Sequence, residues 1–165
     1  MRLLFVVLFA SFTLLSYGQG KVDVLGYKYE LRLSDTTDNI SGIATIYFRA
    51  IVSTEFLELD FSNFNKEGKG MKITDLNTPA ALDIRITASP VHVQYWHENN
   101  KLKIRLPKKL LAGETDTIAL EYKGIPADGL IISKNKYGKR TFFADNWPNR
   151  AHNWIPCVDD PSDKA

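Results

Sequence analysis

Residues 145–165 read DNWPNRAHNWIPCVDDPSDKA, and this stretch decides more about the fold than any other part of the chain. Its prolines exclude a regular helix or a central strand. Trp147 and Trp154 carry large apolar surfaces that favour burial, and each indole N–H needs an acceptor. A segment that is irregular, aromatic and charged at once is predicted to be an ordered loop held against a packed body. We expect Trp154 to be an anchor in the core.

The chain upstream of this stretch reads as strands. Tyrosine and leucine alternate with charged residues in 27–33, which is typical of a strand with one face in water. Similar patterns predict strands over residues 43–52, 55–61, 71–77, 82–87, 91–96, 101–106, 115–122, 130–133 and 140–144. The apolar run of 55–61 indicates a strand covered on both faces. Residues 108–111 allow at most one helical turn.

Turn signals separate these strands. Asn99-Asn100 predicts a hairpin, and Gly138 lies in the predicted turn of another. Short strands at close spacing with polar turns predict an all-β fold, either an antiparallel β-sandwich or a saddle-like curved sheet. We expect this domain to be truncated at its C-terminal end.

The first residues have the pattern of a secretory signal. A positive residue, Arg2, precedes an apolar run that is too short for a comfortable membrane span. We expect residues 1–18 to be a signal peptide and residues 19–165 to be the mature domain. The expected location is therefore periplasmic or extracellular, with no stable membrane span after cleavage. The alternative is an uncleaved N-terminal anchor.

Charge and cysteine content exclude several classes. The formal net charge is +2, and it falls to +1 when Arg2 is removed with the signal peptide. A nearly neutral domain offers no broad basic face for nucleic acid. Cys157 is the single cysteine, so no intramolecular disulfide can form and a hydrophobic core must hold the fold.

The order of residues in 145–165 carries a second signal. It places an arginine, an aromatic residue, Pro-Cys, two acidic residues, a proline and Lys-Ala in turn, at Arg150, Trp154, Pro156, Cys157, Asp159, Asp160, Pro161, Lys164 and Ala165. This order resembles the signature that ends the substrate-facing part of the N-terminal domain in aminopeptidase N-like zinc metallopeptidases (peptidase family M1). Two more residues separate the arginine from Pro-Cys than in the commonest form of the signature. The correspondence upstream of the arginine is therefore open by two positions.

The resemblance continues upstream and covers roughly residues 26–165. It includes the motifs Tyr29-x-Leu31-x-Leu33, Leu57-x-Leu59-Asp60, Leu102-x-Ile104-x-Leu106-Pro107, Ala112-Gly113-Glu114 and Tyr122-x-Gly124. Any β domain could show one such strand, and it is their order before the Pro-Cys segment that is specific. The resemblance implies an N-terminal β domain, incomplete and without its catalytic domain.

In this family the zinc site is His-Glu-x-x-His on a helix, whose two histidines lie one turn apart. None of the three histidines, His92, His97 and His152, stands in such a motif. His92 and His97 are five residues apart and are expected on opposite faces of a strand. We expect no metal or other cofactor in these residues, zinc in the intact parent, and no catalytic activity from the fragment alone.

The resemblance also implies partners for the intact enzyme. Peptides would be its substrates, hydrolysed at their N-terminal residues, and the missing catalytic domain would be a partner in cis. The alternative function is a stand-alone secreted β-sandwich that binds peptide or carbohydrate.

Asp145 and Asn146 are the candidate substrate-binding residues. In the family, a glutamine or glutamate five residues before the signature arginine accepts from the α-ammonium of the substrate, a role suited to a charge-assisted hydrogen bond. Counting back from Arg150 gives Asp145, and the open register makes Asn146 its neighbour candidate. The alternative is that both residues only start the turn before Trp147.

The remaining polar groups have structural interpretations. Arg150 is predicted to pair with Asp159 or Asp160 and fix the loop, with recognition of a substrate carboxylate as the alternative. Cys157 is predicted to be a small buried residue, because it lacks a local base. The aspartates at 159, 160 and 163 are interrupted by Pro161 and are predicted to cap a turn, since a calcium loop brings more oxygen ligands and a glycine.

Overall fold

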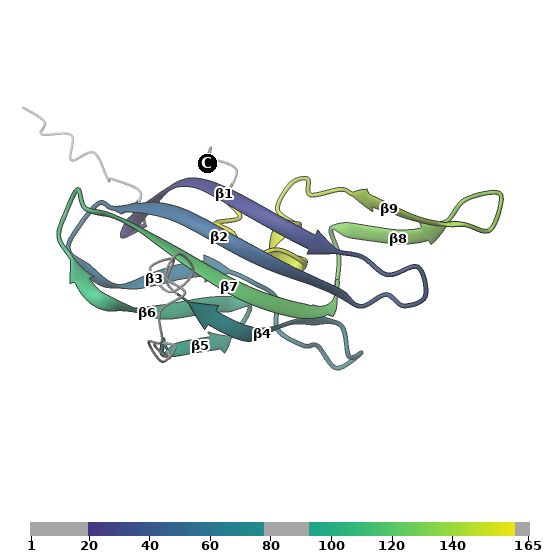
Figure 1. Ribbon diagram of the computed structural model, residues 1–165, viewed down its shortest axis with the longest axis horizontal. Helices are drawn as coiled ribbons and strands as arrows, with labels where there is room; N and C mark the ends of the chain where they lie inside the picture. The colour runs from purple at the N-terminus through teal and green to yellow at the C-terminus, as the bar shows by residue number, and fades with distance from the viewer. Residues whose placement is uncertain (1–19, 78–92, 161–165) are drawn as a thin grey trace, which may run out of the picture.

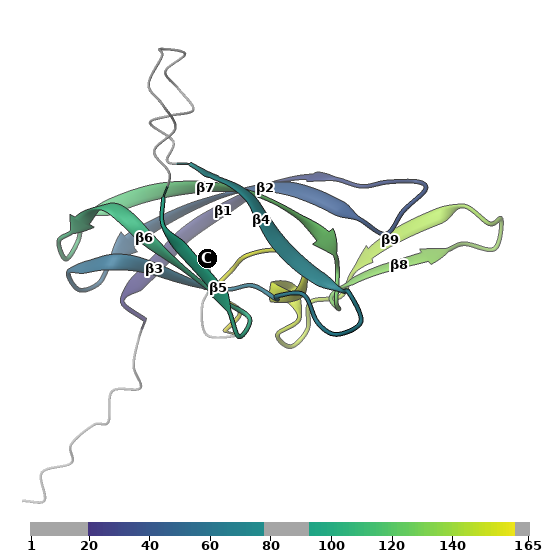
Figure 2. The ribbon, with the colours of Figure 1, turned by 90° about the horizontal axis from the view of Figure 1, so that it is seen from below.

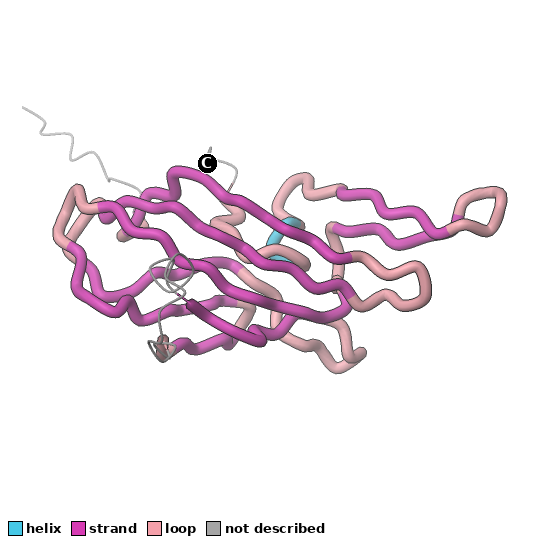
Figure 3. Tube along the Cα trace, viewed as in Figure 1, coloured by secondary structure: helices cyan, strands magenta, loops and turns pink. Residues whose placement is uncertain are grey.

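The computed structural model describes residues 20–77 and 93–160. Within these ranges the chain forms nine β-strands and one short 3-10 helix. Figure 3 colours the strands magenta and the helix cyan. The predicted signal peptide, the predicted strand 82–87, His92 and the signature residues from Pro161 onward lie outside the described residues.

The strands form two packed sheets and one separate hairpin (Figures 1 and 2), all with antiparallel pairing. The first sheet has the order β1 (Val22–Arg32), β2 (Ile40–Ala50), β7 (Thr115–Ile125) and β4 (Gly70–Asn77). The second has the order β3 (Thr54–Asp60), β6 (Lys101–Leu110) and β5 (Tyr95–Glu98). The hairpin pairs β8 (Leu130–Lys134) with β9 (Arg140–Ala144) and projects from one end of the sandwich. The predicted all-β antiparallel sandwich is confirmed.

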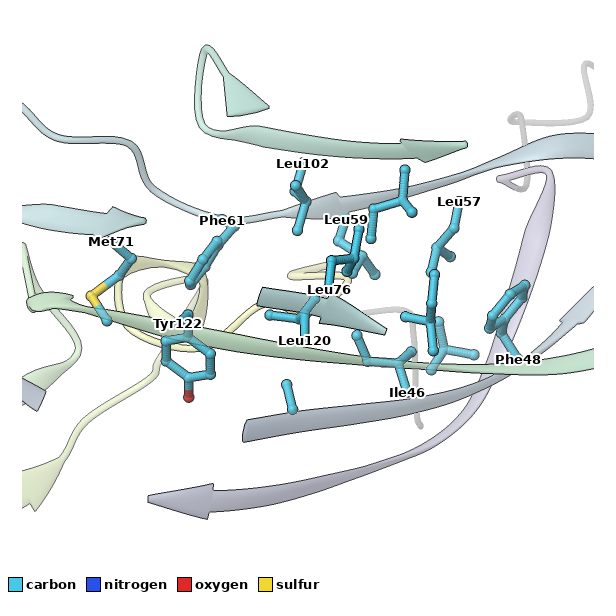
Figure 4. Close-up of a cluster of buried hydrophobic side chains, with 14 of the residues drawn as sticks. Ile46, Phe48, Leu57, Leu59, Phe61, Met71, Leu76, Leu102, Leu120 and Tyr122 are labelled. Atoms are coloured by element: carbon cyan, nitrogen blue, oxygen red, sulfur yellow. The ribbon is translucent and has the colours of Figure 1, made fainter. Parts of the chain in front are cut away.

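Alternating side chains explain how the two layers form. In β2, Ala44, Ile46 and Phe48 are buried while Tyr47 and Arg49 point to water. Because successive side chains point to opposite faces, one face of each sheet is apolar and has to be covered. Figure 4 shows the result, a core into which β2 and β7 project from one side and β3 and β6 from the other.

The core is dense and apolar. Leu57, Leu59 and Phe61 are at most 1% exposed, and the ring of Phe61 meets Tyr122 edge-on at 5.3 Å. The Tyr122 ring also lies over Gly42, where an added Cβ would come within 2.7 Å of it. Each fully buried large apolar side chain contributes about 1.5–3 kcal/mol to folding. The close approach explains why β2 carries glycine at position 42.

The predicted hairpin turns are present. Asn99 and Asn100 have φ of 51° and 57°, the left-handed conformation that a two-residue hairpin turn requires, and they join β5 to β6. Gly138 has φ of 76° in the turn between β8 and β9.

Three sequence predictions about strands are corrected. Residues 108–111 are not a helical turn, because β6 continues to Leu110, which is fully buried and pairs with Thr54. The strand predicted over 55–61 is covered on one face only, since Glu58 is exposed between the buried Leu57 and Leu59. The strand predicted over 91–96 starts later in the described residues, at Tyr95.

Candidate functional site

Residues 145–160, here called the closing segment, dock against the open edge of the second sheet. The segment forms an antiparallel bridge with the end of β3, in which Asp60 N–H donates to Cys157 O at 2.7 Å and Cys157 N–H donates to Asp60 O at 3.1 Å. A third backbone bond runs from Ser62 N–H to His152 O at 2.8 Å. The ordered loop predicted from the prolines and aromatic residues is confirmed.

Two tyrosines of β1 bind the same segment from the first sheet. The Tyr29 hydroxyl donates to Pro156 O at 2.7 Å, and the Tyr27 hydroxyl accepts from Val158 N–H at 2.8 Å. Their rings stack at 5.6 Å because residues two apart on a strand share a face. Burial raises the pKa of the Tyr29 phenol well above its ordinary value, so this group stays a hydrogen-bond donor. The closing segment therefore ties the two sheets together.

Trp154 is the apolar anchor of the segment. It is 7% exposed and belongs to the core, and its Nε1–H donates to Asn146 Oδ1 at 2.9 Å. It follows the 3-10 helix Ala151–Asn153, which turns the chain back towards the sandwich. The prediction for Trp154 is confirmed. The expected burial of Trp147 is wrong, because 76% of this residue is exposed.

Arg150 and Asp145 form an ion pair at the start of the segment, between Nη2 and Oδ2. Arg150 Nε–H also donates to Trp147 O at 2.9 Å, and its Nη1 lies 3.5 Å from Asp128 Oδ1. The side-chain hydrogen bond to Asp145 raises the pKa of the Arg150 guanidinium. A backbone bond from Arg150 N–H to Asn146 O, at 2.9 Å, folds the chain so that the arginine returns to Asp145.

Arg150 was predicted to pair with Asp159 or Asp160, and the structure gives it ion pairs with Asp145 and Asp128 instead. Asp159 instead accepts from His152, through Nδ1 at 2.6 Å and through the backbone N–H at 3.1 Å. His152 lies within the 3-10 helix Ala151–Asn153, and Asp159 N–H donates to Asp60 Oδ2 at 3.1 Å. The turn that the aspartates at 159, 160 and 163 are predicted to cap continues outside the described residues, and this interpretation stays a prediction.

Asp145 and Asn146 differ in the hydrogen-bonding capacity that their side chains have left. The Asp145 side chain is 39% exposed, and a carboxylate has acceptor sites beyond those that one guanidinium nitrogen uses. Asn146 has its side-chain oxygen committed to Trp154 and its backbone oxygen committed to Arg150. The geometry gives Asp145 the capacity to accept from a cation, and it gives Asn146 the turn-forming role. Binding of substrate by either residue stays a prediction.

The other candidate groups lie in structural positions. Cys157 is buried at 6% exposure. His97 stacks on Phe61 at 5.2 Å, and its Nε2 lies 2.9 Å from Phe61 O. Burial, only partly opposed by that hydrogen bond, lowers the pKa of His97.

The residues that the structure describes do not fit a zinc site. Among them, no three His, Cys, Asp or Glu side chains gather closely enough to hold a metal ion. Over the same residues, no helix is long and apolar enough to cross a membrane.

The sequence did not mark every residue that builds the site. Gly129 has φ of 77°, and its carbonyl accepts from Asp145 N–H at 2.7 Å. An added Cβ at Gly129 would lie 2.3 Å from Arg150 O. Asp128-Gly129 is a turn dipeptide, and this is the signal that could have located the contact.

The fold and the closing segment together define a class: a two-layer antiparallel β domain whose sheets are joined by an irregular segment rich in proline and tryptophan. Residues 25–165 match the Peptidase M1 N-terminal domain family, and the chain belongs to that family. The comparison with curated proteins found no match.

Solved structures agree with this assignment. The chain is similar to the M1 zinc metallopeptidase from Deinococcus radiodurans, with 25% identity and a TM-score of 0.63 over 88% of this chain and 31% of that one. A two-domain M1 zinc metallopeptidase variant bound to L-tryptophan aligns with a TM-score of 0.64 at 24% identity, over the same shares, and shows the fold alone. The chain thus spans about a third of the length of these proteins.

Proposed function

We propose that this chain is the substrate-cleft β domain of an exported zinc aminopeptidase and that it grips the amino end of peptides. The observation that carries the proposal is the half-exposed carboxylate of Asp145, fixed by Arg150 at the start of the closing segment. Family membership supports it, as do related structures described as M1 zinc metallopeptidases. Zinc and the hydrolytic step would belong to a catalytic domain in cis, outside the residues described here.

The contribution of this domain would be positional. Arg150 holds the Asp145 carboxylate through an ion pair, and Trp154 holds the adjacent Asn146 amide. A carboxylate held in this way can accept a charge-assisted hydrogen bond from a peptide α-ammonium. An internal peptide bond offers no such cation, so this contact favours substrates with a free amino end.

Kinetics of the full-length gene product test the proposal. Asp145→Ala should lower kcat/KM for peptides with a free amino end by about ten- to a hundredfold, because a hydrogen bond to a charged group contributes roughly 1.5–3 kcal/mol. The ratio of kcat/KM for peptides with a free amino end to kcat/KM for N-acetylated peptides should decrease at the same time. Asn146→Ala is the matched control.

Equal and small effects at both positions, with the fold intact by circular dichroism, would remove the gripping role. A full-length product without aminopeptidase activity would favour the stand-alone binding module instead. The export part of the proposal rests on the apolar run in residues 1–18. Mass spectrometry of protein recovered from outside the cytoplasm should find Gln19 at the amino end, whereas an intact Met1 would contradict cleavage.

A further inference from the structure

The outer face of the first sheet, which points away from the core, carries a row of mainly basic side chains across all four strands. Direct cross-strand partners form this row, here called the basic row: Arg32 on β1, Ser41 on β2, Lys123 on β7 and Lys72 on β4. Like charges that lie directly opposite each other, such as Lys123 and Lys72, destabilise a sheet. Among the described residues, no carboxylate lies within ion-pair distance of these three cations. The basic row is therefore suited to an anionic group from outside the fold.

An acidic row lies beside the basic row on the same face. It consists of Glu30, Ile43 and Glu121, which pair across β1, β2 and β7. Each member stands two residues from a member of the basic row on the same strand, so the two rows are about 7 Å apart. The side-chain hydrogen bond with Lys28 lowers the pKa of Glu30, so this carboxylate is charged at neutral pH. Charges of opposite sign thus border the same stretch of the sheet surface.

The two rows line one hollow in that surface. Its volume is 340 Å³, and ligand pockets typically measure about 300–1,000 Å³. Because β2 lies between β1 and β7, the two carboxylates stand on either side of Ile43 and the cations of β1 and β7 on either side of Ser41. A molecule lying along β2 would meet negative charge at one end and positive charge at the other. The lining includes Glu30, Arg32, Ser41, Ile43, Glu121 and Lys123.

We propose that this hollow binds a short peptide in its zwitterionic form, at a site to which Asp145 does not contribute. The acidic row holds the α-ammonium of the peptide, and the basic row holds its α-carboxylate. An extended dipeptide measures about 7 Å from end to end, which equals the separation of the rows. Both charges of the dipeptide are then matched. An inorganic anion would be repelled by the acidic row, and a simple amine would be repelled by the basic row.

The same geometry sets the affinity and the preferred length. The charged side chains are exposed to water, which screens them, so the expected Kd is on the order of 1 mM. A free amino acid carries its two charges within about half the separation of the rows, and a dipeptide should therefore bind more tightly.

Nuclear magnetic resonance titration of the 165-residue chain with L-alanyl-L-alanine tests the proposal residue by residue. The backbone amide signals of Ser41 and Ile43 should shift and reach saturation. N-acetyl-L-alanyl-L-alanine lacks the ammonium, and L-alanyl-L-alanine amide lacks the carboxylate. Each should bind about five- to twentyfold more weakly, because it loses two exposed charge contacts.

Two double variants remove one row of charge at a time. Glu30→Gln with Glu121→Gln removes the carboxylates, and Arg32→Gln with Lys123→Gln removes the cations of the hollow. Each pair should weaken binding of the dipeptide by about five- to twentyfold. The matched control is Arg49→Gln, on the same face of β2 but outside the hollow, which should leave the affinity unchanged.

The outcomes also separate this site from the contact proposed for Asp145. No saturable shift at Ser41 and Ile43 at about ten times the expected Kd would overturn the zwitterion site. Equal binding of the acetylated or the amidated peptide would overturn it too, because recognition of a single charge needs only one row. Shifts confined to Asp145 and its neighbours would overturn the hollow as a site while supporting the proposed grip on the amino end.

Discussion

The body of the sandwich and the closing segment are held by different kinds of contact. The body is stabilised by many equivalent apolar side chains, such as Ile46, Leu59 and Leu120, each at most 1% exposed. The closing segment is held by one buried indole, a short backbone bridge, two tyrosine hydroxyls and an ion pair.

The two kinds of contact have different consequences: apolar burial stabilises the fold, and hydrogen bonds and ion pairs fix the positions of polar atoms. Burial is roughly proportional to area and has no direction, so the body specifies a shape but not the position of any polar atom. Hydrogen bonds and ion pairs have defined geometry, and in the closing segment they fix the position of Asp145. The four predictions that follow test this contrast.

The largest loss of stability is expected at Trp154, because this residue of the closing segment is buried in the core of the sandwich. Trp154→Ala should lower the free energy of unfolding by about 3–5 kcal/mol, because a buried aromatic is replaced by a cavity. Trp147→Ala, in the same segment but largely exposed, should stay within about 0.5 kcal/mol. Urea titration of both variants measures the two values. A loss at Trp154 similar to that at Trp147 would place the anchor outside the core.

The next effect is expected at Gly129, where backbone geometry rather than burial is at stake. Gly129→Ala combines a positive φ with a Cβ placed 2.3 Å from Arg150 O. We expect a cost of about 1–3 kcal/mol. Gly138→Ala has a similar φ but meets no atom within 4 Å, so it isolates the conformational part. Equal costs at both glycines would show that the segment yields to the added methyl group.

The comparison of Trp154 with Trp147 also shows which features could be predicted from the sequence. Alternation revealed most of the strands, because the period of two is a local property that survives in any sandwich. The size of the two tryptophans predicted burial of both, and this holds for Trp154 alone. The exposure of Trp147 and the pairing of Arg150 with Asp145 did not follow. Both depend on the turn from 146 to 150, which only the folded chain defines.

The same limit applies within the body. Residues 108–111 have local helical character, yet the burial of Leu110 opposite Thr54 draws them into β6. Tertiary packing overrides weak local preference, as is usual for short segments. The candidate site residue Asp145 came from a resemblance in residue order. Its fixation by Arg150 came only from the structure.

A smaller effect is expected at Tyr29, whose hydroxyl joins the body to the segment. Tyr29→Phe removes the donor to Pro156 O while keeping the ring that stacks on Tyr27. The free energy of unfolding should fall by about 1 kcal/mol, the typical net value of one such bond. Tyr137→Phe, at a residue that is 75% exposed, is the control and should be neutral. Thermal or urea unfolding of both variants decides whether the link stabilises the fold.

The smallest effect is expected from His97, whose ring stacks on Phe61, the residue that follows β3. Burial lowers the pKa of this imidazole below 6.5, and the bond to Phe61 O opposes that shift only in part. The unfolded chain then binds more protons than the folded one as the pH falls below about 6.5, so stability must decrease on acidification through that range. Above that pH the imidazole is neutral in both states, and its contribution to stability is fully present. Urea titrations above and below this pH, on the unaltered protein and on His97→Gln, measure the contribution of His97 to the pH dependence of stability. The carboxylates titrate in both proteins, so their contribution cancels in the comparison. The unaltered protein should lose more stability on acidification than the variant; equal losses would mean that His97 charges as easily in the fold as in the unfolded chain.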